Sequence, residues 1–155
     1  MEIISTQLQI PGRCLISNNM VSPKDRVRII LADDHAMVRR GIKKILQEDP
    51  ELIVIDEAGD GQELLEKLKT VTPDLAIVDI SMPRMGGLEA ATRIKQHCPK
   101  MKILILTMHR DKEFLERAME IGVNGYILKE EMDVDLHSAI AHIFAGKTYT
   151  SPLLL

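Results

Sequence analysis

Five polar residues suited to binding a metal and an anion follow four apolar runs of the chain. Asp33 and Asp34 follow the first run, Asp79 and Thr107 follow two later ones, and Lys129 follows the last. Taken singly, Asp and Thr at such positions are common helix caps. Gathered together, two carboxylates about 4 Å apart repel by roughly 4 kcal/mol at an effective dielectric near 20. A divalent cation with oxygen ligands would relieve that repulsion, and Mg²⁺ is the usual choice where phosphate is also bound.

The elements that would position these residues alternate between strands and helices. Short apolar runs predict strands at 27–32, 52–55, 74–79, 102–107 and 125–128. Apolar residues at helical spacing predict helices over about 38–46, 64–68, 88–96, 114–121 and 136–144, and Asp49-Pro50 is expected to stop the first of them. Five such units predict a doubly wound parallel sheet covered by helices on both faces. The site is expected beyond the carboxyl ends of the strands, at the switch in winding direction.

Composition sets the broad class of protein. The chain has 155 residues, about one domain, and 45% of them are hydrophobic, which is enough for a core. Only four residues are aromatic, so the core is expected to consist of Ile, Leu, Val, Ala and Met. A net charge of −3 gives none of the basic excess of a nucleic-acid-binding domain.

The sequence also gives expectations for the cellular location, the cysteines and the first residues of the chain. No apolar stretch is long enough for a membrane span, and the N-terminus does not resemble a signal peptide, so a cytoplasmic protein without membrane contact is expected. Cys14 and Cys98 lack metal-like spacing and are expected to be free thiols in a reducing compartment. Residues 1–25 contain several Pro, Gly and Ser-Asn breakers and are predicted to form a flexible leader.

Four motifs in order resemble the receiver domains of two-component response regulators. The resemblance spans residues 26–147 and rests on Asp33-Asp34-His35, on Asp79-Ile-Ser-Met-Pro83 with Gly86-Gly87, on Ile-Leu-Thr107, and on Gly125-Tyr-Ile-Leu-Lys129. His35 and the ending Gly-Lys-Thr-Tyr-Thr-Ser-Pro152 are similar to the NarL/FixJ-type (LuxR-type) subfamily. This resemblance implies a flavodoxin-like α/β fold, with a five-stranded sheet in the order 2-1-3-4-5. Residues 148–155 would then be the start of a linker.

The resemblance also implies a role for each acidic residue. Asp79 would accept a phosphoryl group from a sensor histidine kinase. Mg²⁺ would be bound by Asp33, Asp34, Asp79 and the backbone carbonyl of Ser81. Gly86-Gly87 is expected to let the loop after Asp79 turn tightly.

Other residues would respond to the added charge. Lys129 would pair with Asp79 at rest and with phosphoryl oxygens afterwards. The hydroxyl of Thr107 would turn to the phosphoryl group, and Tyr126 would swing inward as Thr107 moves. Ser81 and His109 stand where side chains face the phosphoryl group and are hypothesised to set its lifetime.

The function implied is a phosphorylation-dependent switch with slow self-dephosphorylation, rather than an enzyme with a separate substrate. Its output would control a helix-turn-helix DNA-binding domain that this sequence does not include, and it could form a homodimer on phosphorylation. Whether the sequence is an excised domain or natively lacks an effector stays open.

Three alternatives share parts of this pattern. A phosphatase of the haloacid dehalogenase type would need a second Asp two residues after the nucleophile, where this chain has Ser81. A receiver-like interaction module that is never phosphorylated would usually have lost the nucleophile or the acids. A flavin- or nucleotide-binding protein would have a Gly-rich phosphate loop where Asp33-Asp34-His35 stands.

Overall fold

Six parallel strands form one sheet in the computed structural model, which describes residues 26–154. Their order is β2-β1-β3-β4-β5-β6, with bounds β1 (Val27–Ala32), β2 (Leu52–Ala58), β3 (Leu75–Val78), β4 (Lys102–Thr107), β5 (Gly125–Leu128) and β6 (Tyr149–Thr150). The predicted order of the first five strands is confirmed, whereas the predicted number was wrong by one. Two residues are too short a run to show strand periodicity, so β6 gave no recognisable signal. The predicted leader, Cys14 and Leu155 lie outside the described residues.

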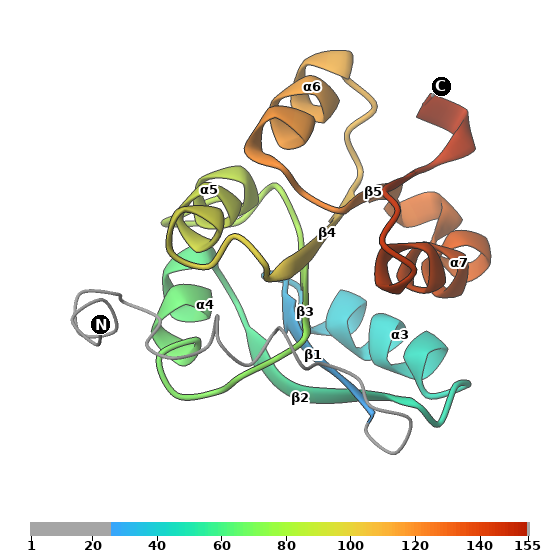
Figure 1. Cartoon of the computed structure of the whole chain (residues 1–155), viewed down its shortest axis with the longest axis horizontal. Helices are drawn as coiled ribbons and strands as arrows, with labels where there is room; N and C mark the ends of the chain where they lie inside the picture. Colours follow the sequence, from blue (N-terminus) through green and yellow to red (C-terminus); the bar gives the residue numbers. More distant parts are fainter. Residues whose placement is uncertain (1–25, 155) are drawn as a thin grey trace.

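Helices cover both faces of the sheet, as predicted. They are α3 (Ala36–Leu46), α4 (Gly61–Lys67), α5 (Gly87–His97), α6 (Lys112–Ile121) and α7 (Met132–Phe144), with short 3-10 helices η2 (Lys129–Glu131) and η3 (Pro152–Leu154). Helices α3 and α7 lie on one side of the sheet, and α4 and α5 lie on the other (Figure 1). Across residues 26–154, none of these helices is both long and apolar enough to cross a membrane.

Each central strand contributes to two separate cores because successive side chains point to opposite faces. In β1, Ile29 and Leu31 pack with the buried residues of α3 and α7. Ile30 and Ala32 pack with those of α4, α5 and α6. This double burial explains why the strands are continuous apolar runs in the sequence.

Several predicted boundaries differ from the observed ones, and that of β2 has a clear physical reason. Strand β2 extends to Ala58 rather than ending at residue 55, and its added residues Asp56 and Glu57 form ion pairs with basic side chains of α3 and α4. The last part of this edge strand is therefore polar and shows no apolar run. Helix α3 ends at Leu46, the last residue of its predicted range, and a turn closed by the Glu48 N to Ile45 O hydrogen bond leads to Asp49-Pro50.

Residues Tyr149–Leu154, which we call the C-terminal strap, pack against β5 and α7. The Ser151 N–H donates to Tyr126 O at 3.0 Å, and the buried Ser151 Oγ accepts from Leu128 N at 3.1 Å. Two of the three strap hydroxyls then donate to one carboxylate of α7: Tyr149 to Asp135 Oδ1 at 3.0 Å, and Ser151 to Asp135 Oδ2 at 3.1 Å. Asp135 is itself buried. Part of the segment predicted to start a linker is therefore fixed to the domain.

Replacing Asp135 with Ala is expected to lower the free energy of unfolding by about 1–3 kcal/mol, because the buried Ser151 hydroxyl would lose its acceptor. Chemical denaturation would measure the change. Asp133→Ala is the matched control, since Asp133 lies in the same first turn of α7 but is exposed, and we expect it to stay within about 0.5 kcal/mol of the parent. Equal midpoints for the two variants would show that the strap hydroxyls do not depend on Asp135.

Candidate functional site

Four strands deliver polar residues to one edge of the sheet. The parallel register pairs Ala32 with Val78 and Thr107 with Leu128, so the residues that follow these strands emerge together. Asp33 and Asp79 are 1% and 5% exposed. They share one cation: Lys129 Nζ lies 2.8 Å from Asp33 Oδ2 and 3.4 Å from Asp79 Oδ2. The site therefore holds a pair of buried acids with a single ammonium between them.

Burial raises the pKa of the Asp79 carboxyl above its usual value. The Lys129 charge opposes this shift, the Asp33 charge adds to it, and a hydrogen bond from the Ser81 backbone N–H opposes it again. The pKa of Asp79 is raised overall, so the charge of Lys129 does not fully compensate for burying the Asp79 carboxylate next to Asp33. The carboxylate of Asp79 is thus placed where additional positive charge would stabilise it.

The third acid of the site, Asp34, is more accessible, with 30% of its side chain exposed. The His35 Nδ1 atom lies 3.0 Å from Asp34 Oδ1 and 3.4 Å from Asp33 Oδ1. Asp33, Asp34 and His35 each have one potential metal-ligand atom, and these three atoms lie within 4.8 Å of one another. His35 therefore lies beside the two acids that follow β1.

The donor set fits a hard divalent cation. Asp33, Asp34 and Asp79 carry three negative charges against the single positive charge of Lys129, which leaves an excess of two. The carboxylate atoms are oxygen ligands of the kind that Mg²⁺ binds, and the Asp34 side chain is partly exposed to solvent.

The residues predicted to set the phosphoryl lifetime contact each other. Ser81 Oγ, on the loop after β3, lies 2.7 Å from His109 Nε2, on the loop after β4. The His109 backbone N–H donates to the Thr107 Oγ1 atom at 3.0 Å, and the His109 ring stacks at a tilt on Phe114. Thr107 is fully buried. The three predicted residues therefore form one chain of contacts along the β4 side of the site.

The loop after Asp79 approaches the strand so closely that only glycine fits. A Cβ on Gly87 would lie 2.0 Å from the Asp79 carbonyl oxygen and 3.0 Å from the Ile80 Cα. The Gly87 N–H donates to Ile80 O at 2.9 Å, so the loop folds back at once into α5. The predicted tight turn at Gly86-Gly87 thus brings the start of α5 against the backbone of Asp79.

Tyr126 lies in the core rather than at the surface. It is 0% exposed and belongs to the core formed with α4, α5 and α6. Its hydroxyl has no hydrogen-bond partner within residues 26–154. Burial, followed by the charge of Asp111, raises the pKa of Tyr126 to about 12. The ring already occupies the inward position that the sequence analysis associated with switching.

Replacing Tyr126 with Phe is expected to leave stability unchanged or to raise it by about 1 kcal/mol, because the hydroxyl is buried without a partner among the described residues. The gain should grow at alkaline pH. The folded pKa of about 12 exceeds the usual 10, so the parent loses stability as pH rises from about 10 to 12 and the variant does not suffer this loss. Denaturation at neutral and alkaline pH would test this. A destabilised variant would show that the hydroxyl has an unseen partner, such as water.

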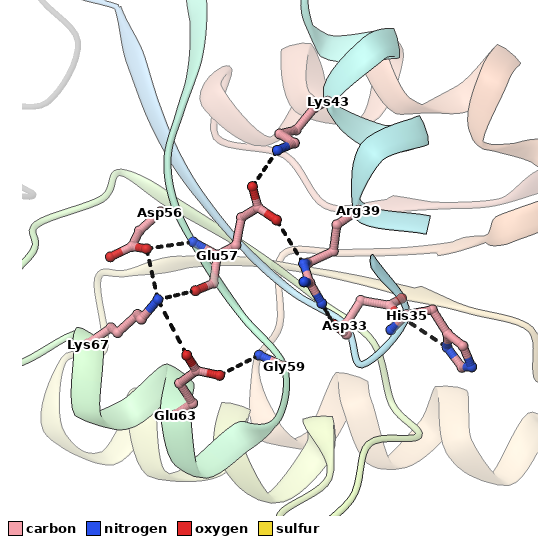
Figure 2. Close-up of polar contacts among 9 residues, drawn as sticks. All are labelled: Asp33, His35, Arg39, Lys43, Asp56, Glu57, Gly59, Glu63 and Lys67. Carbon is pink, nitrogen blue, oxygen red and sulfur yellow. Dashed lines mark hydrogen bonds and ion pairs between the residues drawn. The ribbon is translucent and has the colours of Figure 1, made fainter. Parts of the chain in front are cut away.

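Arg39 is not among the residues predicted from sequence, although it contacts the site. Its guanidinium donates to the backbone oxygen of Asp33 and, through Nε, to Glu57 Oε1 at 2.7 Å (Figure 2). A basic residue in the first turns of the helix that follows the acids was the available signal. It is weak because basic residues are common on exposed helix faces.

Comparison with known proteins places this geometry in a family. The family model for the response regulator receiver domain matches residues 29–141. The oxygen regulatory protein NreC of Staphylococcus carnosus is 42% identical over 127 residues, which are 81% of this chain and 58% of that protein. The transcriptional regulatory protein DegU of Brevibacillus brevis is 35% identical over 83% of this chain and 55% of its own length. The chain thus spans about half the length of the curated relatives it matches.

Solved structures agree with the sequence relatives. A LuxR-family two-component response regulator from Aurantimonas superposes with a TM-score of 0.80 at 36% identity, over 84% of this chain and 93% of that one. A structure of two RcsB dimers bound to two parallel DNAs gives a TM-score of 0.78 at 30% identity, over 84% of this chain and 66% of that one. The chain belongs to the receiver-domain family of two-component response regulators, and its relatives support the NarL/FixJ-type subfamily.

Proposed function

We propose that this receiver domain accepts a phosphoryl group on Asp79 and so acts as a phosphorylation-dependent signalling switch. The observation that carries the proposal is the buried Asp79 carboxylate beside Asp33 and 3.4 Å from Lys129. A buried acid with a raised pKa and an excess of negative charge around it calls for a cation. Phosphoryl transfer depends mainly on this kind of positioning and charge neutralisation.

Asp33, Asp34, Asp79 and the backbone carbonyl of Ser81 would hold Mg²⁺. The bound ion would supply neutralising charge to the phosphoryl oxygens. In the transfer itself, a carboxylate oxygen of Asp79 attacks the phosphorus of a phosphohistidine, and the P–N bond breaks with its electron pair remaining on the imidazole. Lys129, freed from Asp79, pairs with a phosphoryl oxygen, and the Thr107 hydroxyl turns towards another.

The partners follow from the same proposal. The phosphoryl donor would be a sensor histidine kinase. The solved RcsB assembly contains dimers and DNA. By analogy, this domain would dimerise on phosphorylation and act on DNA through a helix-turn-helix domain of the longer protein. The cytoplasmic location expected from the sequence stays a prediction.

Intact mass spectrometry tests the proposal directly. The parent protein incubated with Mg²⁺ and acetyl phosphate is expected to gain one phosphoryl mass, and the gain should be absent with EDTA in place of Mg²⁺. Beryllium fluoride with Mg²⁺ would test for dimerisation without covalent change, read by light scattering. If no phosphoryl group is added under any of these conditions, the domain is an interaction module. Repeated hydrolysis of small phosphate esters would instead identify a phosphatase.

Replacing both Ser81 and His109 with Ala is expected to change the half-life of phosphorylated Asp79 by at least about threefold, since both side chains lie at the site edge. Because the two side chains touch, their single-variant effects should not add. Decay of the phosphorylated mass after removal of acetyl phosphate would give all four half-lives of the cycle. An unchanged half-life in the double variant would exclude a role for this pair.

A further inference from the structure

We infer that Arg39 is a positioning residue for the magnesium site: its guanidinium fixes the peptide that joins Asp33 to Asp34, and its loss weakens Mg²⁺ binding rather than the transfer step. This inference rests on the proposed function, since it assigns a role at the same site. Arg39 lies on α3, outside the set of residues expected to touch metal or phosphate.

The backbone of Asp33 is held from two elements at once. Its N–H donates to Ala58 O of β2 at 3.0 Å, and its C=O accepts from the Arg39 guanidinium of α3. The Asp33 carboxylate accepts in addition from the His35 N–H at 2.9 Å. Asp33 therefore has little freedom before any ion binds.

The Asp33 carbonyl matters for Asp34 because both belong to one planar peptide. Rotation of that plane would move the Asp33 oxygen away from Arg39 and would turn the Asp34 Cα with it. Asp34 is the most accessible of the three acids, and its only described partner is the exposed ring of His35. The hydrogen bond from Arg39 to the Asp33 carbonyl consequently limits the orientations in which the Asp34 carboxylate can bind a cation.

Glu57 orients Arg39. Its Oε1 accepts from Arg39 Nε at 2.7 Å, while its Oε2 pairs with Lys43 on the next turn of α3 (Figure 2). The ion pair also neutralises a positive charge that would otherwise oppose a divalent cation at the neighbouring acids. The planar fork of Arg reaches both Glu57 and the Asp33 oxygen, which a single ammonium group does not do.

Lys43 supplies a matched control. Arg39→Gln and Lys43→Gln each remove one positive charge from α3 and each break one ion pair with Glu57. Only Arg39→Gln also removes the hydrogen bond to the Asp33 carbonyl. Arg39→Lys is the second variant. It keeps the positive charge and can keep the ion pair with Glu57, but it loses the hydrogen bond to the Asp33 carbonyl.

Calorimetric titration with Mg²⁺ alone, on the full chain, tests the inference. We expect the Kd for Mg²⁺ to rise about 10-fold in Arg39→Gln and Arg39→Lys, as for other residues that orient metal ligands, and by less than about twofold in Lys43→Gln. At saturating Mg²⁺, phosphoryl uptake from acetyl phosphate should return to within about twofold of the parent in all three variants. A structural defect would lower that rate at every Mg²⁺ concentration.

The outcomes separate the two proposals. Unchanged Mg²⁺ affinity in both Arg39 variants, with a parent that binds Mg²⁺, would overturn the inference alone. Equal weakening by Arg39→Gln and Lys43→Gln would also overturn it, because charge and not the peptide contact would then be responsible. A parent protein that binds no Mg²⁺ would overturn the proposed function itself.

Discussion

Replacing Asp79 with Asn is expected to abolish phosphoryl uptake completely while the domain stays folded. Asn cannot form an acyl phosphate, and Asp33, the other buried acid that pairs with Lys129, follows β1 rather than β3. The parent should gain one phosphoryl mass with Mg²⁺ and acetyl phosphate, and the variant should gain none. Asp111→Asn is the control, because Asp111 is an exposed acid at the nearby start of α6 and should leave uptake unchanged.

Stability provides an internal check that the Asp79→Asn variant is folded. Burial raises the folded pKa of Asp79 above its usual value, so the folded state binds a proton more tightly than the unfolded state does. In the absence of Mg²⁺, the parent should therefore lose stability as pH rises from the usual pKa through the raised one. The neutral Asn lacks this loss. The variant should be at least as stable as the parent at neutral pH, and its relative advantage should shrink under acid.

Phosphoryl uptake that persists in Asp79→Asn would mean that another acid, such as Asp33 or Asp34, accepts the group. A variant that is unfolded at neutral pH would mean that the Asp79 charge is needed to hold Lys129 in place. Denaturation midpoints at two pH values distinguish these results.

Gly87→Ala is expected to cost more than about 3 kcal/mol of folding free energy, at the upper end of overpacking effects. The added Cβ would lie 2.0 Å from the Asp79 carbonyl oxygen, and every atom it meets within 3.0 Å belongs to the backbone. A rotamer change cannot relieve such a contact, so the β3–α5 loop must move and carry Asp79 with it. A displacement of about 1 Å is enough to slow a positioned reaction by about 100-fold.

Gly122→Ala separates steric from conformational cost. Gly122 ends α6 with a φ of 97°, so an Ala there is strained, but its Cβ would meet no atom within 4 Å. We expect a loss of about 1–2 kcal/mol and no change in phosphoryl uptake. Thermal unfolding and the uptake rate at saturating Mg²⁺ would be measured for both variants. Similar results for the two would show that α5 withdraws from β3 without consequence.

The variants of Asp79, Gly87 and Arg39 test three different features of one site. Asp79 is the proposed phosphoryl acceptor, Gly87 lies against the backbone of Asp79, and Arg39 is the residue inferred to orient the peptide between the acids. Each variant is expected to change a different measured quantity: the covalent mass for Asp79, the free energy of unfolding for Gly87 and the Mg²⁺ affinity for Arg39.

The apolar pattern of the amino-acid sequence by itself determined the parallel sheet, its two covered faces and the edge where the acids gather, whereas the strand order was implied by the family resemblance. The reason is local: strands buried on both sides must be apolar along their whole length, and a polar residue ends each run. Asp33, Asp79 and Lys129 follow such runs directly, so their meeting at one edge follows from parallel topology. Elements that have this apolar pattern were predicted. The polar end of β2 and the two-residue strand β6 lack the pattern and were not predicted.

Only the tertiary structure decided which side chains touch. Ser81 meets His109 over 28 positions of sequence, Asp135 collects two hydroxyls from the C-terminal strap, and Tyr126 points into the core with its hydroxyl unpaired among the described residues. Such contacts depend on loop paths, strand register and rotamers, which many sequences with the same apolar pattern could satisfy differently. Arg39 illustrates the limit: its residue type is common on helices, and its contact with the Asp33 carbonyl exists only because β1, β2 and α3 are packed together.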